Sequence, residues 1–312
     1  MNSNKTIEQL IVDFAEQYDA TETTVKKYTD VVRYFFIWMR RNNHNPRKPE
    51  RKHFISYKKE MIVKYSPYTV DCYLAGIRLF FQYLENVGVY ENYSAGIRNA
   101  RKTLMYKKKA LTVTQTNALL NSLPRTTVKE KRNYAIINTM LRTGMRSIEL
   151  HRANIGDIET TSTGYIMKVQ RKGHTSKDRA ISFDDTVMEP LQDYLLHRTI
   201  NDSEPLLLGY RNRLTTRTIR GIVKQALTQQ GLNSGVYTCH SLRHTFATLS
   251  IEAGCHIDYI RLNLGHSDEK TTRRYLTIVE ERKQQSNIAL QYFNAALNNT
   301  QINANNKHND AT

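Results

Sequence analysis

Apolar residues recur at helical spacing through the first hundred positions of the chain, and this pattern constrains the fold more than any other feature. One stripe covers residues 7–14 and a second covers residues 28–38, with apolar side chains three or four positions apart. A third helix is expected to begin at Ser66-Pro67, because serine suits the N-cap and proline the first turn, and to stop at Gly88. With the basic segment 51–64, the pattern predicts a bundle of about four helices with an aromatic core.

The apolar pattern changes in the second half of the chain. Residues 165–169 and 179–183 have strand-like patterns and flank the turn Arg171-Lys172-Gly173-His174, which predicts a β-hairpin. Four further helices are expected over residues 111–123, 128–141, 184–197 and 216–230. The second of these should end at Thr143-Gly144. The sequence therefore predicts a mainly α-helical chain with a small β-sheet.

The charge of the chain favours a polyanionic partner. The 312 residues include 46 Lys and Arg against 29 Asp and Glu, a net charge of +17, which favours salt-sensitive binding to nucleic acid over a merely soluble basic protein. Residues 1–39 carry a net charge of −2, whereas residues 40–64 carry nine basic and two acidic residues. We expect the DNA-facing surface to begin near Arg40.

A basic segment follows the expected bundle and contains no acidic residue: Arg98, Arg101, Lys102, Lys107, Lys108 and Lys109. Because it lacks apolar periodicity, we interpret residues 99–110 as a linker. A basic strap of this kind can follow a DNA backbone between two lobes, or it can be a solvated hinge.

The cysteines and the N-terminus favour a cytoplasmic protein. Cys72, Cys239 and Cys255 have no Cys-x-x-Cys spacing, which favours a reducing compartment without disulfides. The N-terminus lacks the apolar core of a signal peptide, and the longest apolar run, residues 34–39, is too short to span a membrane. No membrane partner is expected.

Residues 240–275 arrange two histidines, an arginine and a tyrosine in an order suited to covalent cleavage of a phosphodiester. His240 and Arg243 are three positions apart, so on a helix they share one face and can converge on one anion. The turn Leu264-Gly265-His266 comes next, and Tyr275 lies nine residues after His266. This arrangement resembles the tyrosine recombinase, or phage integrase, family.

Cleavage of DNA without a metal ion requires a nucleophile, charge stabilisation and an acid for the leaving sugar oxygen. The phenol of Tyr275 can attack phosphorus and form a phosphotyrosine bond that keeps the bond energy for rejoining, so no cofactor is expected. Arg146 and Arg243 can grip the non-bridging oxygens with planar, charge-assisted hydrogen bonds. Arg146 lies in residues 143–150, which resemble the first arginine box of the family. Glu149, three positions later, can hold Arg146 by a salt bridge.

The resemblance implies that a lysine in the hairpin loop protonates the leaving 5′ oxygen, and Lys172 matches that position. Lys177 lies in the same loop, and Lys168 and Arg171 are neighbours, so these alternatives stay open. All four can instead be charges that position the phosphate.

The imidazoles of His240 and His266 can hydrogen-bond phosphate oxygens or move the tyrosine proton at neutral pH. The resemblance implies that His240 sits beside the scissile phosphate. At the position of His266 the family carries His or Trp, which implies bonding and packing more than obligatory acid–base chemistry.

Two groups of residues suggest a metal site, and neither fits a common pattern. His244 is four positions after His240, but the zinc protease pattern requires Glu directly after the first histidine, where this chain has Ser241. The spacing of Cys239, Cys255 and His256 matches no usual zinc site. We therefore expect no metal.

The resemblance extends from about residue 5 to residue 280 and implies the domain organisation. Residues 1–98 would form a helical, SAM-like core-binding domain and residues 111–297 an α+β tyrosine-recombinase catalytic domain, as in short Xer-type or transposon recombinases. The family also implies a clamp around double-stranded DNA and a homotetramer on two recombination sites, with a monomer in solution. The C-terminal stripe of Ile288, Leu290, Phe293 and Leu297 would dock on a neighbouring protomer, and residues 298–312 would be a disordered tail.

The function that follows is site-specific DNA recombination through a 3′-phosphotyrosyl intermediate. It would serve integration and excision of a mobile element or Xer-like resolution, with accessory DNA-bending or directionality factors as candidate partners. A type IB topoisomerase would use the same chemistry on one duplex. A DNA-binding regulator would keep the fold without catalysis, and it would have little use for the complete residue set.

Overall fold

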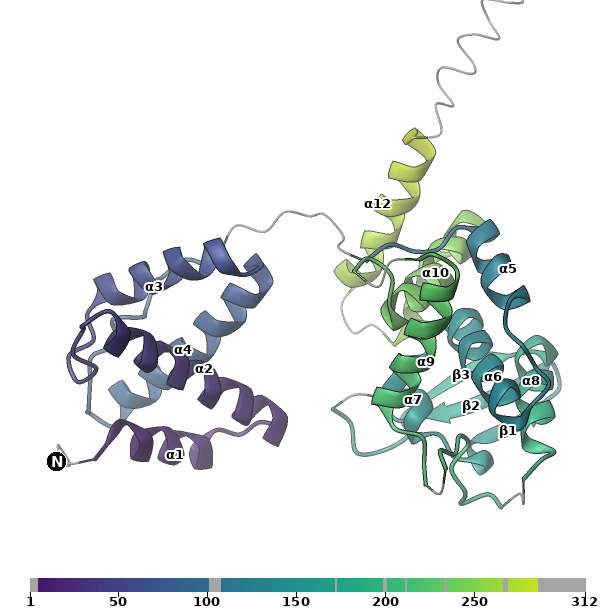
Figure 1. The fold of residues 1–312 in the computed structure, drawn as a ribbon, viewed down its shortest axis with the longest axis horizontal. Coiled ribbons are helices and arrows are strands. Elements are labelled where there is room, and N and C mark those ends of the chain that lie inside the picture. The colour runs from purple at the N-terminus through teal and green to yellow at the C-terminus, as the bar shows by residue number, and fades with distance from the viewer. Residues whose placement is uncertain are drawn as a thin grey trace, which may run out of the picture. The chain divides into compact units, whose positions relative to one another are not determined.

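The computed structural model describes residues 5–100, 108–171, 173–198, 201–210, 212–232, 235–265 and 269–285. The chain divides into two compact units, residues 1–105 and residues 106–312 (Figure 1). Each unit has its own hydrophobic core. Several features predicted from the sequence lie outside the described residues: Lys172, His266, residues 101–107 of the linker, and the C-terminal stripe and tail. Among the described residues, no helix is long and apolar enough to cross a membrane.

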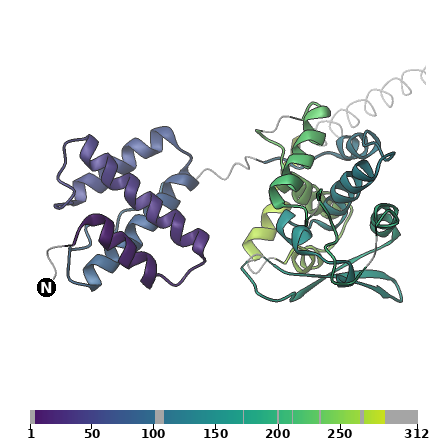
Figure 2. The ribbon, with the colours of Figure 1, turned by 60° about the horizontal axis from the view of Figure 1, so that its bottom comes forward.

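The first unit is a bundle of helices, as the apolar spacing predicts. The helices are α1 (Ile7–Gln17), α2 (Glu22–Arg41), α3 (Arg51–Lys64) and α4 (Pro67–Asn86). They pack across one another (Figure 2). The predicted cap of α4 is present, because the Ser66 hydroxyl accepts a hydrogen bond from the Thr69 backbone N–H at 3.2 Å, and the helix ends just before Gly88.

Aromatic side chains fill the core of the first unit. Phe35, Phe54, Phe80 and Phe81 are at most 1% exposed, and their rings contact one another in stacked and edge-on pairs. This confirms that the aromatic residues of the stripes are core residues. The core extends into the predicted linker, since Ala100 is buried against it.

The second unit combines helices with one antiparallel sheet. Its helices are α5 (Val113–Asn121), α6 (Val128–Thr143), α7 (Ser147–Arg152), the 3₁₀ turn η1 (Ile155–Asp157), α8 (Asp185–Leu195), α9 (Thr216–Gln229), α10 (Cys239–Glu252), α11 (Ile257–Leu264) and α12 (Glu269–Gln285). Its strands are β1 (Ile158–Thr161), β2 (Gly164–Val169) and β3 (Arg179–Phe183), in the order β1-β2-β3. The predicted hairpin is β2–β3, whereas β1 was not predicted because its four residues carry a single apolar side chain.

Helix α6 is the centre of the second unit. Its residues 134–141 are all buried, and α8 and α10 pack along it. Met167 of β2 and Ile181 of β3 face each other in the sheet and turn inward to the same core.

The end of α6 determines where the site forms. Gly144 caps the helix with a left-handed φ of 66°, and a Cβ atom there would lie 2.6 Å from Leu264 and 2.9 Å from Phe246. Only glycine permits both the backbone conformation and the close contact. The chain after α6 therefore passes directly against α10 and the end of α11.

Candidate active site

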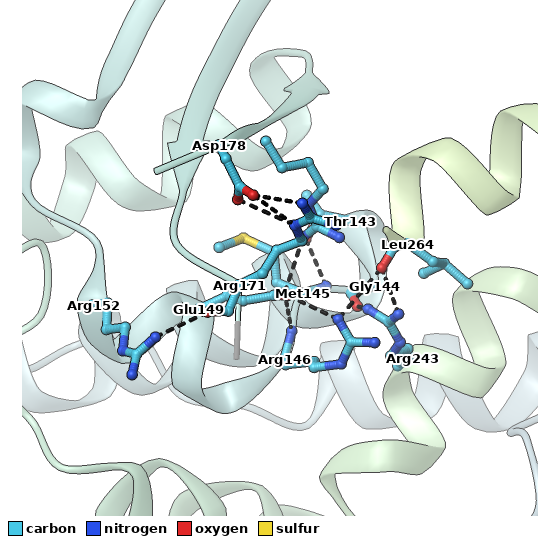
Figure 3. Close-up of polar contacts among 11 residues, drawn as sticks. Thr143, Gly144, Met145, Arg146, Glu149, Arg152, Arg171, Asp178, Arg243 and Leu264 are labelled. Carbon is cyan, nitrogen blue, oxygen red and sulfur yellow. Dashed lines mark hydrogen bonds and ion pairs between the residues drawn. The ribbon is translucent and has the colours of Figure 1, made fainter. Parts of the chain in front are cut away.

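The first arginine of the site stands where the chain turns from α6 into α7. The backbone N–H of Arg146 donates to Oε2 of Glu149 at 2.8 Å, and its Nη1 donates to Oε1 at 2.9 Å (Figure 3). Glu149 is completely buried, whereas the side chain of Arg146 is 26% exposed. One carboxylate thus fixes both ends of the arginine, whose side chain stays partly exposed.

The second arginine lies inside the molecule. Arg243 of α10 is 4% exposed, and it donates from Nη1 to the carbonyl of Gly144 at 2.8 Å and from Nη2 to the carbonyl of Leu264 at 2.6 Å. Nη1 of Arg146 also reaches the Leu264 carbonyl, at 3.4 Å (Figure 3). The guanidiniums of Arg146 and Arg243 therefore converge on one oxygen atom, as they would on the oxygens of one anion.

Burial, followed by the positive charge of Arg146, lowers the pKa of Arg243 to about 10. The guanidinium still carries its charge at neutral pH. Two cations held this close repel each other unless an anion lies between them, so the arrangement favours binding of a negative group.

A third guanidinium, that of Arg179 at the start of β3, was not predicted from the sequence as part of the site. Its Nη2 donates to Oε2 of Glu149 at 3.0 Å, and its side chain is 8% exposed. Within the described part of the chain, Nε and Nη1 of Arg179 are buried without a hydrogen-bond partner. Burial lowers the pKa of Arg179. The sequence contained a signal, because Arg179 lies two positions before the buried Ile181 and so shares the inward face of the strand.

Arg179 also packs against the turn that precedes His266. A Cβ atom on Gly265 would lie 2.5 Å from Nη1 of Arg179, and Gly265 has a φ of 62°. The guanidinium therefore fills the space beside this glycine and supports the turn at the end of α11.

Tyr275 lies within α12, where its side chain is 2% exposed and contacts the small cluster of Ala247, Ile260 and Leu264. Its hydroxyl lies 3.0 Å from Nδ1 of His244 on α10. Since His244 directly follows Arg243, the phenol is held beside the helix that supplies the buried arginine.

His244 is neutral in this environment. Burial, followed by the neighbouring charges of His240 and Arg243, lowers the pKa of His244 to about 4. Among the described residues, no three His, Cys, Asp or Glu side chains form a group that could hold a metal ion. His244 lies instead within hydrogen-bonding distance of the tyrosine, a contact that sequence spacing did not predict.

His240 lies in the first turn of α10 and is exposed. Crowding by its neighbours removes water from part of the ring, and this desolvation, followed by the charges of Arg243 and Arg146, lowers the pKa of His240. The neutral imidazole can donate one hydrogen bond and accept another at the solvent side of the arginine pair.

The loop between β2 and β3 is fastened by ion pairs. Nζ of Lys177 contacts both oxygens of Asp157 at 2.5 and 2.6 Å, and Lys168 pairs with Glu159. Arg171 pairs with Asp178 at 2.5 Å, which lowers the pKa of Asp178 to about 2 (Figure 3). The alternatives to Lys172 are thus each paired with a carboxylate: Lys168, Arg171 and Lys177.

The hairpin loop is also tied to α7. Nη1 of Arg152 donates to the carbonyl of Arg171 at 3.0 Å, one turn along the helix from Glu149 (Figure 3). The residue that follows Arg171 is Lys172, whose own position lies outside the described residues. The base of the loop is therefore fixed to the short helix that Arg146 caps.

The described residues make a cationic site beside a phenol. Arg146 and Arg179 pair with the carboxylate of Glu149, whose charge also bears on Arg243, so the three guanidiniums outnumber this carboxylate. Such a site can bind a phosphate, and the hydroxyl of Tyr275 is a nucleophile of the kind that phosphoryl transfer requires.

Comparisons with known proteins find relatives along most of the chain. The model of the phage integrase family matches residues 109–282, more than half of the chain. Tyrosine recombinase XerC of Leptospira interrogans serogroup Icterohaemorrhagiae serovar copenhageni is 27% identical over 289 residues, covering 89% of this chain and 90% of that protein. Tyrosine recombinase XerD of Yersinia pestis is 26% identical over 289 residues, covering 90% and 95%.

Solved structures share the fold at lower identity. The XerH site-specific recombinase in its post-cleavage complex with palindromic difH substrate has a TM-score of 0.73 and 19% identity, covering 90% of this chain and 84% of that one. The Tn1549 transposon integrase in complex with circular intermediate DNA has a TM-score of 0.67 and 17% identity, covering 86% and 94%.

Proposed function

The chain belongs to the phage integrase family of tyrosine recombinases, and we propose that it is a site-specific recombinase that cuts and rejoins double-stranded DNA through a 3′-phosphotyrosyl intermediate. The observation that carries this proposal is the convergence of Arg146 and Arg243 on one carbonyl oxygen, with Tyr275 hydrogen-bonded to the residue after Arg243. The relatives XerC and XerD, which match nearly the whole chain, support the same activity.

Each step of the reaction has a residue to perform it. The phenolic oxygen of Tyr275 bonds to the scissile phosphorus, and the bond from phosphorus to the 5′ oxygen breaks. Arg146 and Arg243 neutralise the non-bridging oxygens as charge builds up in the transition state. Glu149 keeps Arg146 in position, and the hydroxyl of the partner strand then attacks the phosphotyrosine to rejoin the DNA.

Lys172 is the proposed acid for the leaving 5′ oxygen. Its neighbours Lys168, Arg171 and Lys177 each have a carboxylate partner that competes for their charge. The fixed base of the loop, held by Arg152, would limit where the lysine can reach.

His240 and His266 are the proposed hydrogen-bonding groups for the phosphate. The ring of His240 is exposed beside the arginine pair, which supports a contact with a ligand that arrives from solvent.

The assembly would contain four protomers on two recombination sites, and the protein would be a monomer before it binds DNA. Residues 282–297 would dock on a neighbouring protomer, with DNA-bending or directionality factors as further partners. Integration and excision of a mobile element, or Xer-like resolution, would be its task in the cytoplasm, where its cysteines stay reduced.

The test uses nicked duplexes with a randomised core, in which a short fragment diffuses away after cleavage and traps the covalent adduct. A denaturing gel should show an adduct with the wild-type protein and none with Tyr275→Phe. DNA recovered from the adduct gives the recognition duplex. An adduct that survives in Tyr275→Phe, or its absence from the wild type, would overturn the proposal. Relaxation of a plasmid without a paired site would indicate a topoisomerase instead.

A further inference from the structure

His244 contacts the hydroxyl of Tyr275, and none of the roles assigned above uses it. The two residues are 31 positions apart, and the packing of α12 on α10 brings Nδ1 to 3.0 Å from the hydroxyl. The pair lies at the edge of an apolar cluster formed by Ala247, Ile260 and Leu264. A hydrogen bond in such surroundings is directional and competes little with water.

The protonation state and the tautomer of the ring together decide the direction of this hydrogen bond. Burial and the charges of His240 and Arg243 keep the ring neutral, so one ring nitrogen can accept. A phenol is a strong donor because its oxygen shares electron density with the ring. In the tautomer that carries its proton on Nε2, Nδ1 of His244 accepts the hydrogen bond from the hydroxyl of Tyr275.

We propose that His244 takes the proton of Tyr275 when the DNA strand is cut and returns it when the strand is rejoined, an inference that rests on the proposed function. As the phenolic oxygen bonds to phosphorus, its proton passes to Nδ1. The bond from phosphorus to the 5′ oxygen breaks, and that oxygen takes a proton from Lys172. Rejoining runs the same transfers in reverse, so no proton is gained or lost over the cycle.

Binding of DNA would itself raise the basicity of His244. The charged and titratable groups that bear on the ring include His240 and Arg243 on its own helix and Tyr275 on α12. The positive charge of Arg146 in turn lowers the pKa of His240 and of Arg243. A phosphate held by the two arginines opposes these positive charges, which favours the protonated imidazole. The phenol therefore keeps its proton until the substrate arrives.

Three substitutions separate the proton-accepting role from simple packing. His244→Asn places an amide near the position of Nδ1, where it can hydrogen-bond but cannot take a proton. His244→Phe keeps the ring volume without any acceptor, and His244→Gln places its amide nearer to Nε2. His256→Asn is the matched control, because His256 is an exposed N-cap residue of α11 and asparagine caps equally well.

The measurement is single-turnover cleavage of the recognition duplex recovered from the adduct, with either oxygen or sulfur as the 5′ bridging atom. A sulfur leaving group needs no acid, so it relieves a defect in Lys172 but not one on the nucleophile side. We expect His244→Asn, His244→Gln and His244→Phe to slow cleavage of both duplexes by about 10²-fold or more. The defect should shrink as the pH rises, because hydroxide can then remove the phenolic proton. His256→Asn should react like the wild type.

The outcomes distinguish this inference from the function on which it rests. Wild-type cleavage by His244→Asn, while Tyr275→Phe is inactive, would overturn the role of His244 and leave the recombinase intact. Rescue of His244→Asn by sulfur would also overturn it, because the residue would then act on the leaving group. An adduct with Tyr275→Phe would overturn the recombinase itself.

A measurement on the wild type covers the case in which the variants do not fold. The ¹⁵N spectrum of histidine-labelled protein reports whether a ring carries one proton or two. In the covalent adduct, His244 should carry both ring protons at neutral pH. A ring that stays neutral there would contradict the proposal.

Discussion

Arg179 and Glu149 form a buried ion pair of 3.0 Å, and the same carboxylate holds Arg146 through its backbone and its side chain. Glu149 therefore connects β3 with the start of α7. A carboxylate that compensates two guanidiniums inside the protein holds both of them in place, since neither can move without leaving a charge unpaired.

Glu149→Gln should destabilise the protein and reduce cleavage. Loss of the negative charge leaves Arg146 and Arg179 to repel each other, at a cost of about 3 kcal/mol in the free energy of unfolding. Urea titration measures this value. Glu159→Gln removes a carboxylate from the exposed pair with Lys168 and should change stability by less than about 1 kcal/mol. Equal effects of the two substitutions would show that Glu149 has no special position.

Gly144→Ala should cost more stability than the same change at Gly231. Both glycines have left-handed φ angles, 66° and 68°, but a Cβ atom meets Leu264 and Phe246 at Gly144 and nothing within 4 Å at Gly231. The backbone strain is about 1 kcal/mol at either position, and the clash should add about 1–3 kcal/mol at Gly144. Thermal melting compares the two. Gly144→Ala should also reduce cleavage, because the displaced turn carries Arg146.

Stability should fall in mild acid because of His244. Folding lowers the pKa of this residue from 6.5 to about 4, so the unfolded chain binds the proton more tightly. The contribution of His244 to the free energy of unfolding is complete above about pH 6.5 and is lost as the pH falls toward 4. It amounts to at most about 3 kcal/mol. His240 acts in the same direction. Urea titrations of the wild type and His244→Asn at several pH values should show a shallower decline in the variant, and parallel curves would contradict this.

Lys172→Ala should reduce cleavage of the oxygen duplex by about 10²-fold or more, because the leaving oxygen loses its acid. Lys177→Ala should act mainly on the hairpin, since Lys177 compensates Asp157, whose side chain is 10% exposed. Its cleavage rate should be affected less than that of Lys172→Ala. If Lys177→Ala proves the more defective in catalysis and sulfur at the 5′ position rescues it, the acid is Lys177.

Local patterns predicted most of the elements. The helices of the first unit, the hairpin of β2 and β3, and the stop of α6 at Gly144 follow from apolar spacing, capping residues and turn chemistry. Strand β1 was missed because its register depends on β2 and not on its own composition.

The sequence by itself determined the order of the helices and the positions along that order of the arginine, histidine and tyrosine residues of the site. The apolar spacing, capping residues and motif spacing that reveal them act between residues a few positions apart. Only the tertiary structure decided which side chains meet. The contacts of Arg179 with Glu149 and of His244 with Tyr275 join residues 30 and 31 positions apart. Such pairs depend on how β3 and α12 pack against α7 and α10, and the packing is a property of the whole core that no local spacing specifies.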